Sequence, residues 1–341
     1  MVLESGWLQE KEGGYELTRP LPVLAIPATL SDSLMARLDR LDTAKPVAQL
    51  GSVIGRQFSY SLLRAVSSLD EEALRHALGR LVASQMLYQR GVLPQAVYAF
   101  KHALIQETAY QSLLKSTRQL YHQRIAEVLV TLFPDVTPEQ PELLAHHYEQ
   151  AGLLREALPY WLQAGQRAVE RSANTEAIQH LSKGIEVLQT LPETTEHLRQ
   201  QLSILVALGA PLFMVKGHAS PEVERVYSRA LELARRVGDS GQSVAALMGL
   251  ARFSIASGQL RTARQLREQS LTLAEATGDP ILQREARMML GTTLYYLGEL
   301  DSARSHLEQG LELEVPGQSQ DLLTAFSRGT HPETFSRAHL A

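Results

Sequence analysis

A heptapeptide of this chain occurs twice, first as Leu233-Ala234-Arg235-Arg236-Val237-Gly238-Asp239 and again 40 residues later as Leu273-Ala274-Glu275-Ala276-Thr277-Gly278-Asp279. At the same offset, Gly258 matches Gly298. A fixed period of about 20 to 50 residues is the signature of stacked supersecondary units, each of which buries its apolar face against its neighbours. The sequence therefore predicts a repeat array, which we assign to residues 139–314.

The type of repeat follows from where small residues fall, because two helices cross closely only where side chains are small. One copy runs from Gly291 through Gly298 at a turn to Ala303, the bulky Leu307 and Gly310. This order is typical of tetratricopeptide helical hairpins, with Gly291 and Ala303 at the closest approaches and Leu307 as the bulky residue between helices. Three further copies fit the template: Trp161, Ala164, Gly165, Ala168, Ala177, Leu181 and Gly184; then Leu208, Gly209, Val223, Tyr227 and Ala230; then Leu247, Leu250, Ala251, Gly258, Ala263 and Ser270.

A partner-binding groove is the predicted functional site of these repeats. In solenoids of this type, the first helix of each hairpin faces the concave side, and Met, Tyr and Arg supply adaptable apolar and charged contacts there. The alternative interpretation is that the two methionines are ordinary core residues. The predicted groove residues are Met248, Arg252, Met288, Thr292, Tyr295 and Tyr296.

The composition limits the chemistry that the chain can perform. It has 341 residues, no Cys, and 33 basic against 37 acidic side chains, for a net charge of −4. The length predicts about two domains, and the missing sulfur excludes disulfides and thiolate catalysis. No run reaches about 18 apolar residues and the N-terminus lacks the order of a secretory signal, so we expect a cytoplasmic protein.

The part of the chain before the repeats reads as a smaller mixed module. A hairpin around Gly13-Gly14 is expected within residues 1–28. Over residues 29–135, helices are predicted at about 44–54, after Ser59 and from about Asp70, followed by a β-hairpin whose strands are 86–90 and 96–100. Three helices and then a hairpin are the order of a winged helix. The fold class is therefore mainly α: a winged-helix-like module followed by a tetratricopeptide-type superhelix.

The ends of the repeat array are set by two breaks in the pattern. The proline-containing segment 133–138 is the predicted joint with the first module, because proline lacks a backbone donor and disfavours helix before it. An additional helix is expected at 142–151. The tail 315–341 departs from the period, and we expect it to be disordered or truncated.

No catalytic, cofactor or metal motif stands out. The chain contains no Gly-Lys dipeptide, so it cannot form the phosphate-binding loop that uses this lysine. His146-His147 is the only histidine pair, and neighbouring helical residues point about 100° apart, so we expect one to pack and the other to be solvated. We therefore predict no enzyme activity, no bound cofactor and no metal site for this chain.

A DNA-binding winged helix is the alternative function. The helix from about Asp70 offers Arg75 and Arg80, but it also carries Glu71 and Glu72. Residues 1–135 hold 14 basic and 13 acidic side chains, so little counterion release is expected on a duplex. The charge balance favours protein partners over nucleic acid, and nothing indicates a membrane.

Several segments carry a family resemblance: Ala25–Leu30, Leu34–Leu41, Ile54–Phe58, Phe100–Tyr110 and Glu142–Tyr148, continued to Asn174. They resemble the C-terminal region of large bacterial signalling proteins that combine a class III adenylate/guanylate cyclase domain, an AAA-type (STAND-like) ATPase and tetratricopeptide repeats. The resemblance covers about residues 1–314.

The resemblance implies the role of each part. Residues 1–28 would be the tail of a preceding ATPase lid, residues 29–135 the winged-helix portion, and the repeats a sensing or docking arm. ATP and Mg²⁺ would be bound only by an upstream domain outside this chain, which is then a fragment or a split gene product. The chain is thus interpreted as a non-catalytic regulatory segment whose partners are proteins or an upstream ATPase domain.

Overall fold

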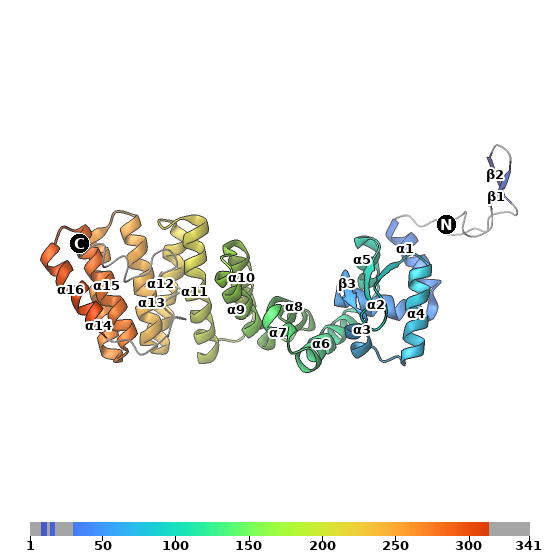
Figure 1. Cartoon of the computed structure of the whole chain (residues 1–341), viewed down its shortest axis with the longest axis horizontal. Helices are drawn as coiled ribbons and strands as arrows, with labels where there is room; N and C mark the ends of the chain where they lie inside the picture. Colours follow the sequence, from blue (N-terminus) through green and yellow to red (C-terminus); the bar gives the residue numbers. More distant parts are fainter. Residues whose placement is uncertain (1–7, 12–13, 18–29, 314–341) are drawn as a thin grey trace. The chain divides into compact units, whose positions relative to one another are not determined.

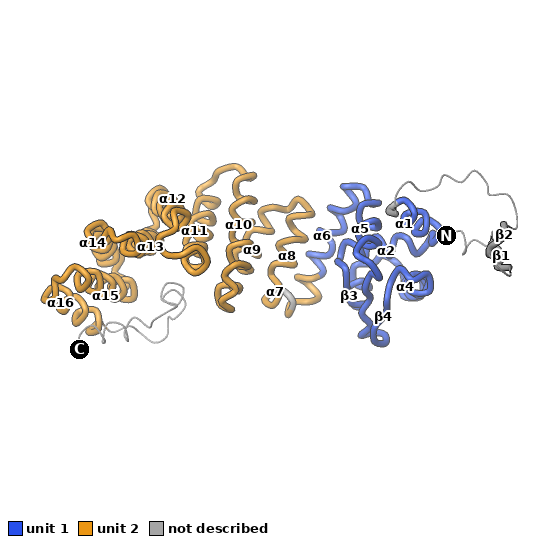
Figure 2. The backbone as a smooth tube through the Cα atoms, turned by 90° about the horizontal axis from the view of Figure 1, so that it is seen from above, with its two compact units in different colours: residues 1–128 blue, residues 129–341 orange. Residues whose placement is uncertain are grey.

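The computed structural model describes residues 8–11, 14–17 and 30–313 of the chain (Figure 1). The chain divides by internal contacts into two compact units, Met1–Val128 and Leu129–Ala341 (Figure 2). This division falls inside one helix, whereas the proline-containing joint predicted at 133–138 follows that helix. The expected tail at 315–341 lies outside the described residues.

The first unit combines helices with a small antiparallel sheet. Its two-stranded hairpin pairs Leu8 with Leu17 and Lys11 with Gly14, which confirms the hairpin predicted around Gly13-Gly14. A separate three-stranded sheet has the order β3-β5-β4. The described elements are β1 (Leu8–Lys11), β2 (Gly14–Leu17), α1 (Leu30–Asp39), η1 (Asp42–Ala44), α2 (Lys45–Ile54), β3 (Gln57–Ser59), α3 (Tyr60–Val66), α4 (Glu71–Ala83), β4 (Leu87–Arg90), β5 (Val97–Phe100), α5 (Ala103–Gln111) and α6 (Lys115–Leu132).

Capping side chains explain where the helices of this unit begin. The Ser59 hydroxyl accepts a hydrogen bond from the backbone N–H of Leu62, and a carboxylate oxygen of Asp70 accepts one from Ala73. Such caps satisfy helix N–H groups that have no partner within the helix. Both predicted helix starts are therefore confirmed, as is the hairpin of β4 and β5. The strand β3 was not predicted.

The second unit is a stack of helical hairpins. Consecutive helices from α8 to α16 pack on one another, and α9, α11, α13 and α15 also contact the next helix of this set. The first helices of successive hairpins therefore form one layer, which we call the inner layer. The described helices are α7 (Val136–Glu139), α8 (Pro141–Ala151), α9 (Leu154–Glu170), α10 (Asn174–Gln189), α11 (Thr195–Lys216), α12 (Pro221–Val237), α13 (Ser240–Ala256), α14 (Leu260–Thr277), α15 (Pro280–Tyr296) and α16 (Leu300–Glu312).

The heptapeptide that marks the repeat forms the joints between hairpins. Gly238 ends α12 in the left-handed backbone region, with a φ of 73°, and Gly278 ends α14 in the same way at 72°. The next residue, Asp239 or Asp279, then caps the following helix by accepting hydrogen bonds from its first N–H groups. Glycine adopts this conformation without strain, and aspartate is a preferred cap, so two residues stop one helix and start another.

A bulky side chain pressed against glycine holds each hairpin together. A Cβ atom placed on Gly291 would lie 2.7 Å from Cγ of Leu307 and 3.0 Å from the carbonyl oxygen of Ala303. A Cβ on Gly165 would lie 2.4 Å from Cγ of Leu181. These distances are shorter than any normal carbon contact, so glycine is required. The predicted close approach at Gly291 is confirmed, and the array is of the tetratricopeptide type.

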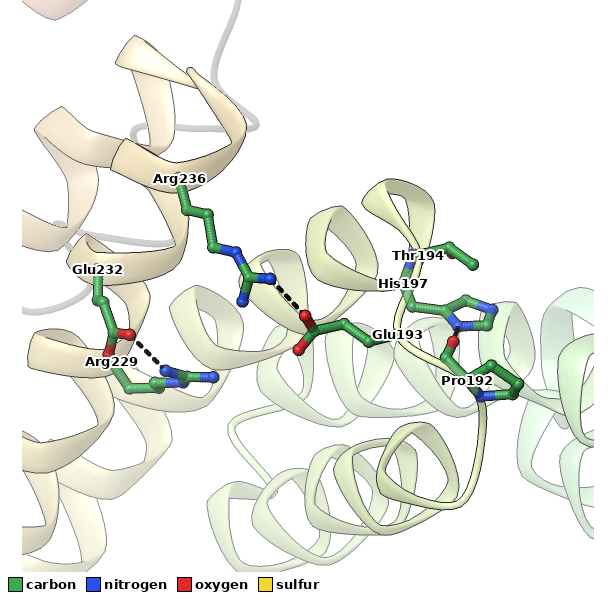
Figure 3. Close-up of polar contacts among 7 residues, drawn as sticks. All are labelled: Pro192, Glu193, Thr194, His197, Arg229, Glu232 and Arg236. Carbon is green, nitrogen blue, oxygen red and sulfur yellow. Dashed lines mark hydrogen bonds and ion pairs between the residues drawn. The ribbon is translucent and has the colours of Figure 1, made fainter.

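The longest joint lies between α10 and α11 and is tied down by polar contacts (Figure 3). The Thr194 hydroxyl caps α11, and Nδ1 of His197 lies 2.5 Å from the carbonyl oxygen of Pro192. Glu193 pairs with Arg236 of α12, which links the joint to the next helix of the array. Another pair in the figure, Arg229 with Glu232, lies on the exposed face of α12, where ion pairs contribute little to stability.

One helix, α11, is long and apolar enough to cross a membrane by composition alone, with a mean hydropathy of 1.4 over its most apolar window. Half of that window is buried inside the protein. Its buried residues belong to the hydrophobic core that α9 to α13 share, among them Leu202, Ile204 and Leu208. The apolar character of α11 is therefore accounted for by packing between hairpins.

Gly291→Ala is expected to destabilise the array by about 1–3 kcal/mol, because the added methyl group overlaps Leu307 and forces the two helices apart. Gly241→Ala is the matched control on α13, since its Cβ would meet only ordinary contacts at 3.6 and 4.0 Å. The control should leave the free energy of unfolding unchanged or raise it by up to about 1 kcal/mol. Urea unfolding followed by circular dichroism measures both, and equal effects would contradict the packing argument.

Candidate functional site

The structure does not place all the predicted groove residues on an open surface. Met248, Met288 and Thr292 are only 5%, 1% and 7% exposed. Met248 lies in the core cluster that includes Leu271 and Leu290. Met288 packs under α16, where its Cγ would be 2.9 Å from a Cβ on Gly310. These two methionines hold helices together, as the alternative interpretation expected, and their assignment to a groove is corrected accordingly.

Thr292 is also occupied within its own helix, because its hydroxyl donates a hydrogen bond to the carbonyl oxygen of Met288 at 2.9 Å. The other predicted residues are accessible. Tyr295 and Tyr296 are 41% and 45% exposed, with ring centroids 6.0 Å apart in an edge-to-face arrangement. Arg252 is partly exposed, and its guanidinium lies over the ring of Phe213, 5.3 Å from the centroid.

Arg252 is the centre of a group of ionisable side chains that the sequence analysis did not bring together. Its charge acts on Tyr227 of α12, Arg267 of α14 and Glu285 of α15. We call Arg252, Arg267 and Glu285 the arginine cluster. Two of its members, Arg252 and Glu285, belong to neighbouring helices of the inner layer, and Arg267 belongs to the helix that packs against both.

Arg267 is the most unusual residue of this cluster. It is 3% exposed, and its Nε and Nη1 atoms are enclosed with no hydrogen-bond partner. Burial, and then the neighbouring charge of Arg252, lower the pKa of Arg267 to about 9, while Glu285 acts in the opposite direction. The guanidinium therefore remains charged at neutral pH although it is almost fully withdrawn from water.

Glu285 is the single acidic member of the cluster and is 6% exposed. Burial raises the pKa of Glu285 to about 7, and the charges of Arg267 and Arg252 oppose this rise. Near neutral pH, the cluster therefore holds two positive charges and at most one negative charge. The signal for this site was available at the 40-residue offset, where Tyr227 and Leu307 flank Arg267 and where Ala245 precedes Glu285.

Two hollows of the second unit offer less chemistry. A cleft of about 740 Å³ lies among α12, α13 and α14, lined by residues such as Leu231, Asp239 and Gln269. A smaller one of about 260 Å³ contains Arg264, whose guanidinium lies 2.7 Å from carboxylate oxygens of both Glu268 and Glu299. The arginine of the smaller hollow is thus fully engaged by its neighbours, unlike Arg267.

The described part of the chain contains no group of three or more His, Asp or Glu residues arranged to hold a metal ion. The histidine pair behaves as predicted, with His147 buried at 1% exposure and His146 exposed. Their rings lie 5.7 Å apart in an edge-to-face arrangement.

Comparison of the sequence with known proteins finds one informative relative, and no family model matches the chain. The chain is 35% identical over 211 residues to a protein of Rhizobium meliloti (strain 1021) described as uncharacterized protein R02095. The alignment covers 62% of this chain and 20% of that protein. The chain therefore spans about a fifth of the length of the curated relative it matches.

Solved structures with some likeness are helical-repeat proteins. The Signal Transduction ATPase with Numerous Domains (STAND) protein with a tetratricopeptide repeat sensor, PH0952 from Pyrococcus horikoshii, is 12% identical, with a TM-score of 0.42 over 93% of this chain and 56% of that one. The apo form of RapI is 9% identical, with a TM-score of 0.46 over 87% and 86%. Scores this low carry no argument, and the fold assignment rests on the hairpin geometry described above.

Glu285→Gln is expected to change how stability depends on pH. The folded pKa of Glu285, about 7, lies above the ordinary value of 4.5, so the folded state binds more protons in this window. Stability therefore falls as pH rises from about 4.5 to 7, and this loss requires an ionisable side chain. Gln cannot ionise, so the variant should gain about 5 °C in melting temperature over the wild type at about pH 8 and little at about pH 5.

Scanning calorimetry at both pH values measures this difference. Glu232→Gln is the control, because Glu232 lies on the exposed face of α12 with 62% of its side chain accessible. The control should show the same pH dependence as the wild type. An equal shift of Glu285→Gln at both pH values would contradict a buried carboxyl group with a raised pKa.

Proposed function

We propose that the repeat array is a protein-docking segment without catalytic activity of its own. The observation that carries this proposal is the pair of exposed tyrosines on the inner-layer helix α15, next to the helix that bears Arg252. Tyrosine and arginine dominate the binding energy of protein interfaces, because they combine large contact area with hydrogen-bonding groups. A stacked array offers such side chains along several helices at once.

The proposed setting is a regulatory segment of a cyclase/ATPase-type signalling protein in the cytoplasm. This part of the proposal rests on the sequence resemblance and not on the solved structures. In this setting, ATP and Mg²⁺ would be bound by an upstream domain, and the array would couple partner binding to it. We further propose that residues 29–135 form a winged-helix-like module, a proposal supported by the succession of α2, α3 and α4 and the hairpin of β4 and β5.

Protein contact, in preference to DNA, is the role that the charges of this module favour. On α4, Arg75 pairs with Glu71 at 2.6 Å, and Arg80 donates a hydrogen bond to the Thr43 hydroxyl at 3.1 Å. Arginines held by neighbours in this way are less available to phosphates, and Glu71 and Glu72 lie at the start of the same helix. DNA binding remains the alternative function, to be separated by experiment.

The tyrosines provide the direct test of docking. Random linear peptides displayed on phage would be selected on the purified chain, and their affinities would be measured by interferometry. We expect Tyr295→Ser/Tyr296→Ser to weaken the selected peptides by at least about tenfold without lowering the melting temperature. Tyr88→Ser, at a tyrosine of the other unit that is 56% exposed, is the matched control and should keep full affinity. Failure to select any peptide would contradict the docking role.

Two further measurements separate the alternatives. The purified chain should hydrolyse no ATP above the background of a mock preparation. It should also give no mobility shift with duplex DNA that weakens with salt, because phosphate contacts would release counterions. ATP turnover by the chain would overturn the non-catalytic assignment, and a salt-dependent shift would favour the DNA-binding alternative.

A further inference from the structure

Arg267 occupies a position that the other hairpins fill with an apolar or aromatic side chain. Counting by the repeat, the equivalent residues are Leu181, Tyr227 and Leu307, which are 0%, 1% and 1% exposed. Each of these three packs against a glycine of a first helix. A buried guanidinium without hydrogen bonds destabilises the fold relative to leucine at such a position. Natural sequences break their own packing rules mainly at functional sites.

The position of the cluster makes this arginine available for binding. Arg267 interacts electrostatically with Arg252 of α13 and Glu285 of α15, both of which belong to the inner layer. Two guanidinium groups and one carboxylate leave an excess of one positive charge. A single carboxylate from outside the chain would neutralise this excess and supply acceptors for the enclosed Nε and Nη1 atoms of Arg267.

We propose that the arginine cluster binds one carboxylate of an acidic peptide segment of a partner protein, with Arg267 and Arg252 as its ligands. This inference rests on the docking function proposed above. The planar fork of arginine matches a carboxylate with two parallel hydrogen bonds. A phosphate group fits less well, because its second negative charge would exceed the available positive charge and face Glu285.

The spacing on α15 defines the peptide further. Tyr296 follows Glu285 by 11 residues, which places both within about 20° on one face of the helix and about 16 Å apart along it. An extended chain covers about 3.3 Å per residue, so about five residues separate the two contacts. The partner segment is therefore expected to carry an acidic residue about five positions from the part that meets the tyrosines.

Peptide pools of equal length test this inference. Each pool is acetylated and amidated at its ends, is randomised elsewhere, and has Glu, Gln or phosphoserine fixed at one position. We expect the wild-type chain to bind the Glu pool at least about tenfold more tightly than the Gln pool and more tightly than the phosphoserine pool. Arg267→Leu should remove the preference for Glu while binding to the Gln pool persists.

The same variant separates binding from structure. Arg267→Leu restores the residue found at the equivalent positions Leu181 and Leu307, so it should raise the melting temperature while it lowers affinity for the Glu pool. Arg261→Leu removes the same charge from an exposed position of α14 and should change neither the preference nor the affinity. A rise in melting temperature with an unchanged preference for Glu would show that Arg267 does not bind the peptide and would overturn the inference.

The pools also distinguish the two proposals. Binding of all pools with equal affinity would overturn the carboxylate site and leave the docking function standing. A stronger phosphoserine pool would overturn the single-carboxylate assignment. No binding of any pool by the wild-type chain would contradict the docking function, and the carboxylate inference would fail with it.

Discussion

The contact of one bulky side chain with a glycine on the facing helix is the constraint on which the repeat array depends. Leu307 against Gly291 and Leu181 against Gly165 bring the two helices of a hairpin so close that no Cβ fits between them. This contact sets the spacing within a hairpin, and Gly238 with Asp239 sets the joint to the next one. Because both devices recur at a fixed interval, the first helices line up as one inner layer and can present side chains in common.

The parts of this fold that were predictable are those encoded by short-range patterns. Helix starts at Ser59 and Asp70, and the glycine at position 291, follow from capping and small-residue spacing, which the chain displays locally. The strand Gln57–Ser59 was missed because it has only three residues and pairs with Val97–Ala99, about 40 positions away. Nothing near Phe58 in the sequence announces that partner, so its place in the sheet depends on tertiary packing.

The candidate site was predictable only in part, for a related reason. Arg252, Tyr295 and Tyr296 lie on an accessible face as predicted, but Met248 and Met288 pack between helices. A first helix in a stack is buried against its own partner and against the neighbouring hairpins, so helical periodicity alone cannot say which apolar residues face the open side. The cluster around Arg267 was visible as a break in the repeat, where arginine replaces leucine or tyrosine.

That break connects stability with binding. A buried charge pair is weak evidence for stability, since desolvation offsets much of the attraction between the charges. Here the imbalance goes further, because two guanidinium groups face one carboxyl group whose pKa has risen to about 7. A carboxylate arriving beside Glu285 would raise that pKa again and favour its protonated form. The cluster can therefore adjust its own charge to an anionic group, which a leucine at position 267 would prevent.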